Sequence, residues 1–333
     1  MAEAELPDYI DEQDQEIEFE RRMLPIGYEH LPIVQSGHIC NGRFRGEADY
    51  LQYISIIKRR GRETIYTFDG EPLDIIKKQT LAAGSFGSVS KLTAVTPLLD
   101  KPIEFIVKVS AAGAARALEE ARLFDVVEGE EWLKGKHPSE VFQCSGLVPI
   151  RYVGGYILMP VADGDLHSLI GQLAVDSVKE VITILGNILA CLSTLKLHYF
   201  DLKPLNVLYR CASEDGINVL LADLGSMIPL EGGFTCTYPP PEAIGGIISQ
   251  ELCAEHENRI YTYLLCVFYA MMLTGIDGPH WSLSKWQYGN QLSTLGKALQ
   301  EKEAPSKYLD VLYLVYKDVK VDNIPPLDEF LKL

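Results

Sequence analysis

The sequence is short of positive charge and has no long apolar run. Its 30 lysines and arginines are outnumbered by 46 aspartates and glutamates, giving a formal net charge of −16. This balance argues against direct binding to nucleic acids or to anionic membranes. The longest nearly apolar run, residues 261–273, is too short to span a bilayer and predicts a buried helix instead. The acidic N-terminus also predicts that no secretory leader is present.

The cysteines show no recognisable pattern. The seven cysteines form no C-x-x-C pair and have no spacing typical of a Cys/His metal site. An odd number without a framework predicts free thiols in a reducing compartment, and hence an intracellular protein, cytoplasmic or nuclear. Cys191 and Cys266 lie inside apolar runs and are expected in the core.

The composition is sufficient for a large folded unit. With 333 residues and 47% hydrophobic content, the chain can form one large domain or two lobes. Residues 1–20 carry nine acidic side chains and no lysine or arginine, which predicts a disordered tail. Residues 21–73 are interpreted as an N-terminal extension. No feature of the sequence indicates an oligomeric state.

A short polar loop between apolar runs contains Asp201, Lys203 and Asn206, and the next apolar run ends at Asp223 in Asp-x-Gly. A base, a cation and two oxygen ligands on neighbouring loops are the groups that phosphoryl transfer requires. The two segments resemble the catalytic loop, H-R-D-L-K-P-x-N, and the D-F-G metal loop of eukaryotic-type protein kinases. The resemblance implies that Asp201 is the catalytic base and that Lys203 neutralises phosphate charge. It also implies that Asn206 and Asp223 hold Mg²⁺.

Residues 81–89 read as strand, glycine turn, strand, and a plain hairpin is the simpler interpretation of this segment alone. In this context the segment resembles the kinase glycine-rich loop, with Ala82 in place of its first glycine. The implied ATP contacts are Gly84, Ser85, Phe86, Gly87 and Val89.

Lys108 follows in a β-branched run. By itself it would be a snorkelling edge residue, but by the resemblance it grips the α- and β-phosphates. Residues 111–127 have the composition of a helix, and Glu120 lies on its inward face, where it is expected to pair with Lys108. Ile106 stands where the family usually has alanine above the adenine.

Residues 154–166 resemble the hinge between the two kinase lobes. Met159 would border the adenine, Asp165 would reach the ribose, and Leu208 would line the same nucleotide site. Pro160 has no N–H to offer the adenine.

Three departures from the family pattern surround the catalytic loop. The usual His-Arg is Tyr199-Phe200, and Phe200 cannot bind a phosphate, so activation-segment phosphorylation is not expected to switch the protein on. His198, just before the pair, is interpreted as structural. Tyr261 stands where the family has the aspartate that anchors the catalytic loop.

Residues 235–242 resemble the T-x-x-Y-x-A-P-E end of the activation segment. In this alignment the Thr235 hydroxyl would contact the catalytic aspartate and lysine, as in serine/threonine kinases. Glu242 has no evident arginine partner.

The resemblance implies an α+β, two-lobed kinase-like fold, with a β-rich N-lobe at 74–160 and a mainly helical C-lobe at 161–333. The implied activity is ATP- and Mg²⁺-dependent transfer to Ser/Thr hydroxyls of protein substrates. Two alternatives stay open: a pseudokinase scaffold that binds partners, and a small-molecule kinase. The divergent features are similar to kinases of large DNA viruses, in which case the location would be the host cell.

Overall fold

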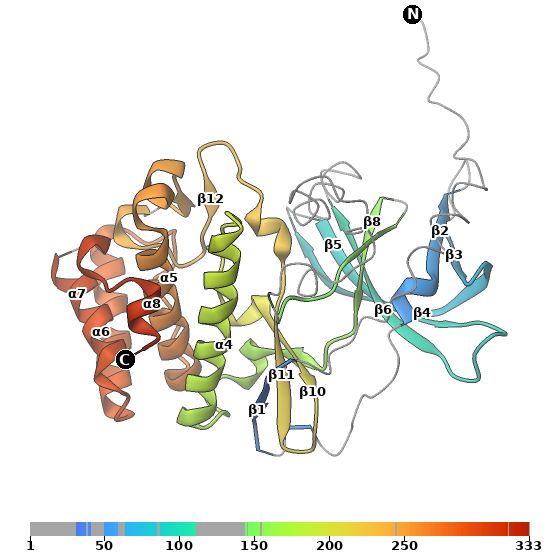
Figure 1. The fold of residues 1–333 in the computed structure, drawn as a ribbon, viewed down its shortest axis with the longest axis horizontal. Coiled ribbons are helices and arrows are strands. Elements are labelled where there is room, and N and C mark those ends of the chain that lie inside the picture. Colours follow the sequence, from blue (N-terminus) through green and yellow to red (C-terminus); the bar gives the residue numbers. More distant parts are fainter. Residues whose placement is uncertain are drawn as a thin grey trace, which may run out of the picture.

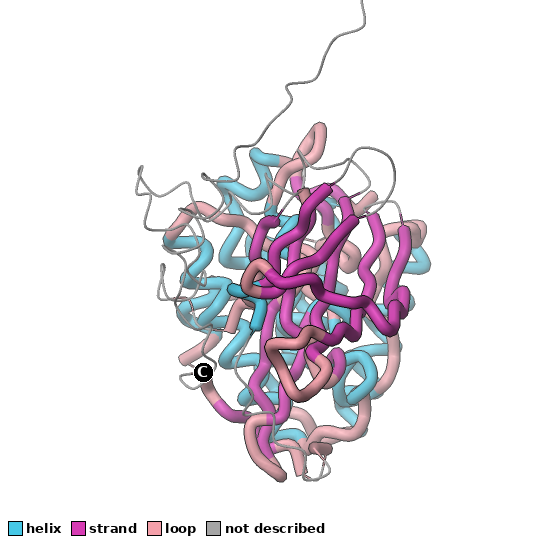
Figure 2. Tube along the Cα trace, turned by 90° about the vertical axis from the view of Figure 1, so that its right-hand side faces the viewer, coloured by secondary structure: helices cyan, strands magenta, loops and turns pink. Residues whose placement is uncertain are grey.

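The computed structural model describes residues 31–37, 39–40, 50–58, 64–84, 87–110, 144, 146–153, 155–243, 245–318 and 320–332. Most strands gather in one part of the molecule and most helices in the other (Figures 1 and 2). The larger sheet is antiparallel, with strand order β2-β3-β4-β5-β6-β8-β7. Its strands are β2 (Ile54–Lys58), β3 (Thr64–Phe68), β4 (Glu71–Gly84), β5 (Gly87–Val95), β6 (Ile103–Ser110), β7 (Arg151–Val153) and β8 (Tyr156–Pro160).

The sheet forms because its strands bury apolar side chains on one face. In the second half of β5, buried and partly exposed residues alternate, as expected of a strand with one face against a core. Leu92, Phe105 and Leu158 from three adjacent strands belong to one buried cluster. The register pairs Lys108 of β6 with Val89 of β5 and with Ile157 of β8. Lys108 is thereby fixed beside the glycine hairpin.

The sheet begins earlier than the sequence predicts. The expected boundary between an extension and the N-lobe, at residue 74, falls inside β4. Strands β2 and β3, from the supposed extension, continue the same sheet. The strand β1 (Ile33–Gln35) instead pairs with β11 (Gly216–Leu221) in the other half of the molecule. The described part of 21–73 is therefore shared between both halves, while the predicted tail at 1–20 lies outside the described residues.

The helical half is built around α5 (Gln250–Thr274), whose residues 260–273 are all buried, as predicted for the apolar run. Helix α4 (Val175–Thr194) packs against α5. No helix in the described part of the chain combines the length and apolarity needed to cross a bilayer. The other helices of the described residues are η1 (Tyr50–Tyr53), η3 (Leu166–Leu169), η4 (Pro204–Asn206), η5 (Leu224–Met227), η6 (Pro241–Ala243), α6 (Lys285–Glu301), α7 (Ser306–Asp318), η7 (Val321–Asn323) and α8 (Leu327–Phe330).

Two smaller sheets lie outside the larger one. The first has the order β1-β11-β10-β9, with β10 (Val207–Cys211) directly after the catalytic loop and β9 at Gly164–Asp165. The second pairs β12 (Phe234–Thr235) with β13 (Ile247–Ile248). The chain directly after Asn206 is therefore held by strand pairing.

Four cysteines are paired, which makes the expectation of free thiols wrong for them. Disulfides join Cys40 to Cys211 and Cys144 to Cys191. Each bridge connects positions far apart in the sequence, so spacing alone gave no sign of either. Cys266, predicted to be a core residue, is free and buried, as are Cys236 and Cys253. The pairing removes the basis on which a reducing compartment was inferred.

Candidate active site

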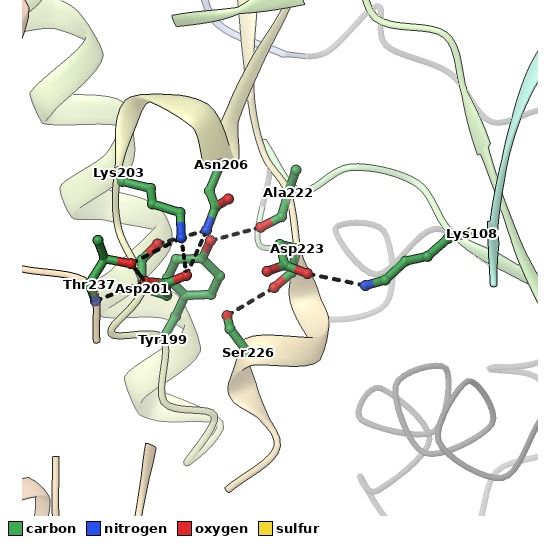
Figure 3. Close-up of polar contacts among 9 residues, drawn as sticks. All are labelled: Lys108, Tyr199, Asp201, Lys203, Asn206, Ala222, Asp223, Ser226 and Thr237. Carbon is green, nitrogen blue, oxygen red and sulfur yellow. Dashed lines mark hydrogen bonds and ion pairs between the residues drawn. The ribbon is translucent and has the colours of Figure 1, made fainter. Parts of the chain in front are cut away.

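The loop between α4 and β10 presents the predicted catalytic residues on one side of the helical half. Its three-residue turn η4 contains Pro204 at its start, where the missing proline N–H is not needed. Asp201 and Asn206 are both buried, at 7% and 8% exposure. Figure 3 shows Asp201, Lys203 and Asn206 converging from this loop, with Asp223 and Lys108 alongside.

Both carboxylate oxygens of Asp201 accept hydrogen bonds. Lys203 Nζ donates to Oδ2 at 2.6 Å, and Asn206 Nδ2 donates to the same oxygen at 3.1 Å and to the Asp201 carbonyl at 2.8 Å. The backbone N–H of Thr237 donates to Oδ1 at 3.0 Å, and its hydroxyl donates to Oδ1 as well. A buried carboxylate needs such donors to remain charged. The contacts fix Asp201 in one orientation.

The hydroxyl contact predicted for Thr235 is made by Thr237, two residues further along. Thr237 Oγ1 accepts from Lys203 Nζ at 3.0 Å and bonds Asp201, so it joins base and cation. Thr235 instead lies in β12, where its backbone is paired with Ile247. The kinase pattern T-x-x-Y-x-A-P-E places its threonine seven residues before the glutamate, which is Thr235 when Glu242 is that glutamate. Thr237 lies only five residues before Glu242, so this stretch is two residues shorter than the pattern.

Asp223 precedes η5 and has φ 54° and ψ 51°, the left-handed region that a non-glycine residue adopts at a cost. Ser226 donates from its backbone and from its hydroxyl to the Asp223 carbonyl, which holds the turn. The carboxylate accepts from Lys108 Nζ at 3.1 Å. Lys108 of the strand-rich half thus contacts Asp223, which follows β11 in the other half (Figure 3). The predicted partner Glu120 lies outside the described residues.

The residues expected around a nucleotide are only partly described. Gly84 and Gly87 pair across the tip of the β4–β5 hairpin, and Gly87 has φ 132°, a conformation that favours glycine. Ser85 and Phe86 lie outside the described residues. Both interpretations of residues 81–89, a plain hairpin and a phosphate-binding loop, are compatible with this backbone geometry.

Met159 and Leu208 come from opposite halves of the chain but pack against the same small apolar cluster. Ile106 is paired with Met159 across β6 and β8 and is buried. These contacts place the predicted adenine neighbours together. Asp165 accepts from the Ser168 N–H at 2.9 Å as the N-cap of η3, a structural role that the sequence did not predict.

Tyr199 and Tyr261 connect the catalytic loop to its surroundings through their hydroxyls. Tyr199 donates to the Ala222 carbonyl, beside Asp223, at 2.8 Å. The Tyr199 N–H donates to the Tyr261 hydroxyl at 3.2 Å, so Tyr261 acts as the altered anchor expected from the sequence. Burial raises the pKa of both phenols well above the usual value, so both remain protonated donors.

Phe200 is completely buried in an aromatic cluster. Its ring lies 5.3 Å from that of Tyr261, 5.6 Å from Phe234 and 6.2 Å from His198. A phosphate could not share this apolar environment without losing its hydration. The position that would bind an activation-segment phosphate is thus filled with apolar packing.

His198 forms part of a polar cluster behind this loop. Its Nδ1 lies 2.5 Å from Glu257 Oε1, and hydrogen bonds to Cys253 and Glu257 raise the pKa of the imidazole to about 10. Glu257 also accepts from Ser193 at 2.7 Å and from Tyr261 at 2.8 Å. The structural interpretation of His198 fits these contacts. Nothing in the sequence distinguishes Glu257 from Glu251 and Glu255 on the same helix.

Glu242 is held by the backbone rather than by an arginine. Its Oε1 accepts from the Val321 N–H at 2.6 Å. Because η7 supplies this N–H, the end of the expected activation segment is tied to the last part of the chain. A backbone donor has no sequence signature, which explains why the partner was missed.

The chain resembles solved kinase structures, although no protein-family model and no curated protein matches it. It superimposes on Rad53 residues 1–466 in complex with AMP-PNP, with a TM-score of 0.50 and 16% identity, covering 84% of this chain and 64% of that one. A second match is the Mycobacterium tuberculosis PknI kinase domain, with a TM-score of 0.45 and 18% identity over 80% of this chain and 94% of that one. The fold is the two-lobed α+β fold of protein kinases, as predicted.

Proposed function

We propose that this protein is a protein kinase that transfers the γ-phosphate of Mg-ATP to Ser or Thr hydroxyls of protein substrates. The observation that carries the proposal is the Asp201–Lys203–Thr237–Asn206 network. It orients a carboxylate and a cation beside each other, next to the Lys108–Asp223 pair. Positioning and charge neutralisation are the main protein contributions to phosphoryl transfer.

The residues present fit a magnesium nucleotide. Asp223 offers a carboxylate, and Asn206 spends its NH₂ group on Asp201, which leaves its amide oxygen as the group for a metal. Oxygen ligands of this kind suit Mg²⁺. Lys108 would hold the α- and β-phosphates, and the hairpin glycines Gly84 and Gly87 would leave space for them. When bound, Mg-ATP supplies the transferable phosphoryl group and a divalent charge.

Asp201 would accept the proton of the substrate hydroxyl, and Lys203 would offset the negative charge that builds up during transfer. Met159, Leu208 and Val89 are assigned to the nucleotide site, with Asp165 near the ribose. The contact from Thr237 supports a Ser/Thr substrate, because this hydroxyl holds both Asp201 and Lys203 in place.

A pseudokinase scaffold is the competing function. Ile106, buried at the adenine position, favours it because a larger side chain narrows the nucleotide site. The hydrogen-bonded Asp201 network favours an enzyme, because a scaffold has no need to orient a base and a cation together.

Transfer of labelled γ-phosphate from Mg-ATP to a basic protein, with wild type against Asp201→Asn, tests the proposal. Removing the base should lower the rate by about 10²–10⁴-fold. Asp310→Asn, an exposed carboxylate on α7, is the matched control and should keep full activity. Wild-type protein that binds ATP but transfers no phosphate to protein, peptide or metabolite substrates would favour the scaffold.

A further inference from the structure

A second group of chemically capable side chains lies behind the catalytic loop. His198, Cys253 and Glu257 each offer one ligand atom, and these atoms all lie within 4.8 Å of one another. Cys253 is buried, whereas the side chains of His198 and Glu257 are 25% and 15% exposed. Among the described residues this is the group in which several metal-binding atoms converge.

The fold explains why the three side chains meet. Cys253 and Glu257 are four residues apart on α5, so they lie on one face of the helix. His198 reaches this face from the chain that leaves α4. A helical pair plus one residue from another segment is an arrangement that metal sites commonly use. His198 is far from Cys253 and Glu257 in the sequence, which is why cysteine and histidine spacing gave no sign of the group.

The surroundings are built to hold these side chains in place. Glu257 accepts from the Ser193 hydroxyl at 2.7 Å through Oε2 and from the Tyr261 hydroxyl at 2.8 Å through Oε1. The His198 ring stacks on Phe200 and meets Phe234 edge to face. Such outer contacts orient ligands and tune their affinity in known metal sites.

We propose that His198, Cys253 and Glu257 bind one divalent transition metal ion of the zinc type, with water as the fourth ligand. One nitrogen, one thiolate sulfur and one carboxylate oxygen form a ligand set that Zn²⁺ accepts and that Mg²⁺ and Ca²⁺ do not favour. On binding, the thiol and the imidazolium release their protons to water, and the ion replaces the direct His198–Glu257 contact. The partial exposure of His198 leaves access for the water.

The ion would be structural rather than catalytic. Glu257 contacts Tyr261, whose hydroxyl accepts the N–H of Tyr199, two residues before Asp201. Metal binding would therefore fasten the segment before the catalytic loop to α5. The proposal does not depend on phosphoryl transfer.

Titration with Co²⁺ tests the site directly, because bound Co²⁺ reports its ligands by absorption. Protein freed of metal with a chelator is titrated with Co²⁺ and then with Zn²⁺, without thiol reductant so that paired cysteines stay paired. We expect one equivalent of Co²⁺, visible bands of tetrahedral geometry and a sulfur-to-cobalt charge-transfer band, all displaced by Zn²⁺.

Two variants identify the sulfur ligand. Cys253→Ala should remove the charge-transfer band. It should also weaken Zn²⁺ binding by more than about 10–100-fold, which is the loss caused by removing a residue that only supports a ligand. Cys266→Ala changes another buried free cysteine of α5 and should leave the spectrum unchanged. If Cys253→Ala fails to fold, the wild-type spectrum decides alone. The absence of a charge-transfer band, or a band that Cys253→Ala retains, would overturn the assignment without affecting the proposed function.

Discussion

Replacing Thr237 is the sharpest test of the site geometry, because the sequence and the structure disagree about this position. Thr237→Ala keeps the backbone N–H bond to Asp201 but removes the hydroxyl that contacts both Asp201 and Lys203. The base and the cation then lose the group that holds them together. We expect slower phosphoryl transfer with little change in nucleotide affinity.

The size of the effect follows from the bonds removed. A hydrogen bond to a charged group contributes about 1.5–3 kcal/mol, and each 1.4 kcal/mol or so of barrier changes a rate about tenfold. If one such bond is lost in the transition state, kcat should fall by about 10–150-fold. Thr237→Ser keeps a hydroxyl and should stay close to wild type.

Steady-state kinetics with a protein substrate at saturating Mg-ATP give kcat and KM for each variant. The matched control is Thr235→Ala, since the pairing of Thr235 with Ile247 in β12 and β13 uses the backbone. The reasoning fails if Thr235→Ala loses as much activity as Thr237→Ala, or if Thr237→Ala retains the wild-type kcat.

Three further outcomes are expected. Tyr261→Phe leaves the Tyr199 N–H without its acceptor, which should cost about 1–3 kcal/mol; urea unfolding measures the loss, and unchanged stability would contradict the anchor. Glu242→Ala releases the Val321 N–H, so amide exchange at residues 321–324 should accelerate, and wild-type protection there would disprove the tie. Phosphatase treatment should leave kinase activity unchanged, because Phe200 offers no phosphate site; a large loss of activity would refute this.

The local part of the site could be predicted from the sequence. Asp201, Lys203 and Asn206 lie within six consecutive residues, so the short turn η4 alone brings them together. Asp223 could be predicted as well, because it lies two residues after the end of β11. Where the reactive residues lie on one loop and just after one strand, their order and spacing in the sequence are sufficient to predict the site.

Contacts that depend on irregular segments could not be predicted. Thr237 takes the place expected for Thr235 because the stretch between Thr237 and Glu242 is two residues shorter than in the T-x-x-Y-x-A-P-E pattern, and the sequence alone cannot locate that difference. Strands β2 and β3 were missed because each is only 5 residues long. The two disulfides and the Glu257 contacts join segments distant in sequence, and such pairing is decided by the packing of the whole chain.

The departures from the kinase sequence pattern around the catalytic loop share one physical feature: each side chain is held by a buried ring, a hydroxyl or a backbone N–H. Phe200 fills an arginine position with aromatic packing, Tyr261 replaces an anchoring carboxylate with a hydroxyl, and Glu242 bonds a backbone N–H of Val321. A contact between an arginine and a phosphorylated residue forms only after the phosphate has been added. Buried rings and backbone donors are in place once the chain has folded, because their partners belong to the core. The contacts around Asp201 that these residues support are therefore made when the chain folds, and they need no added phosphate.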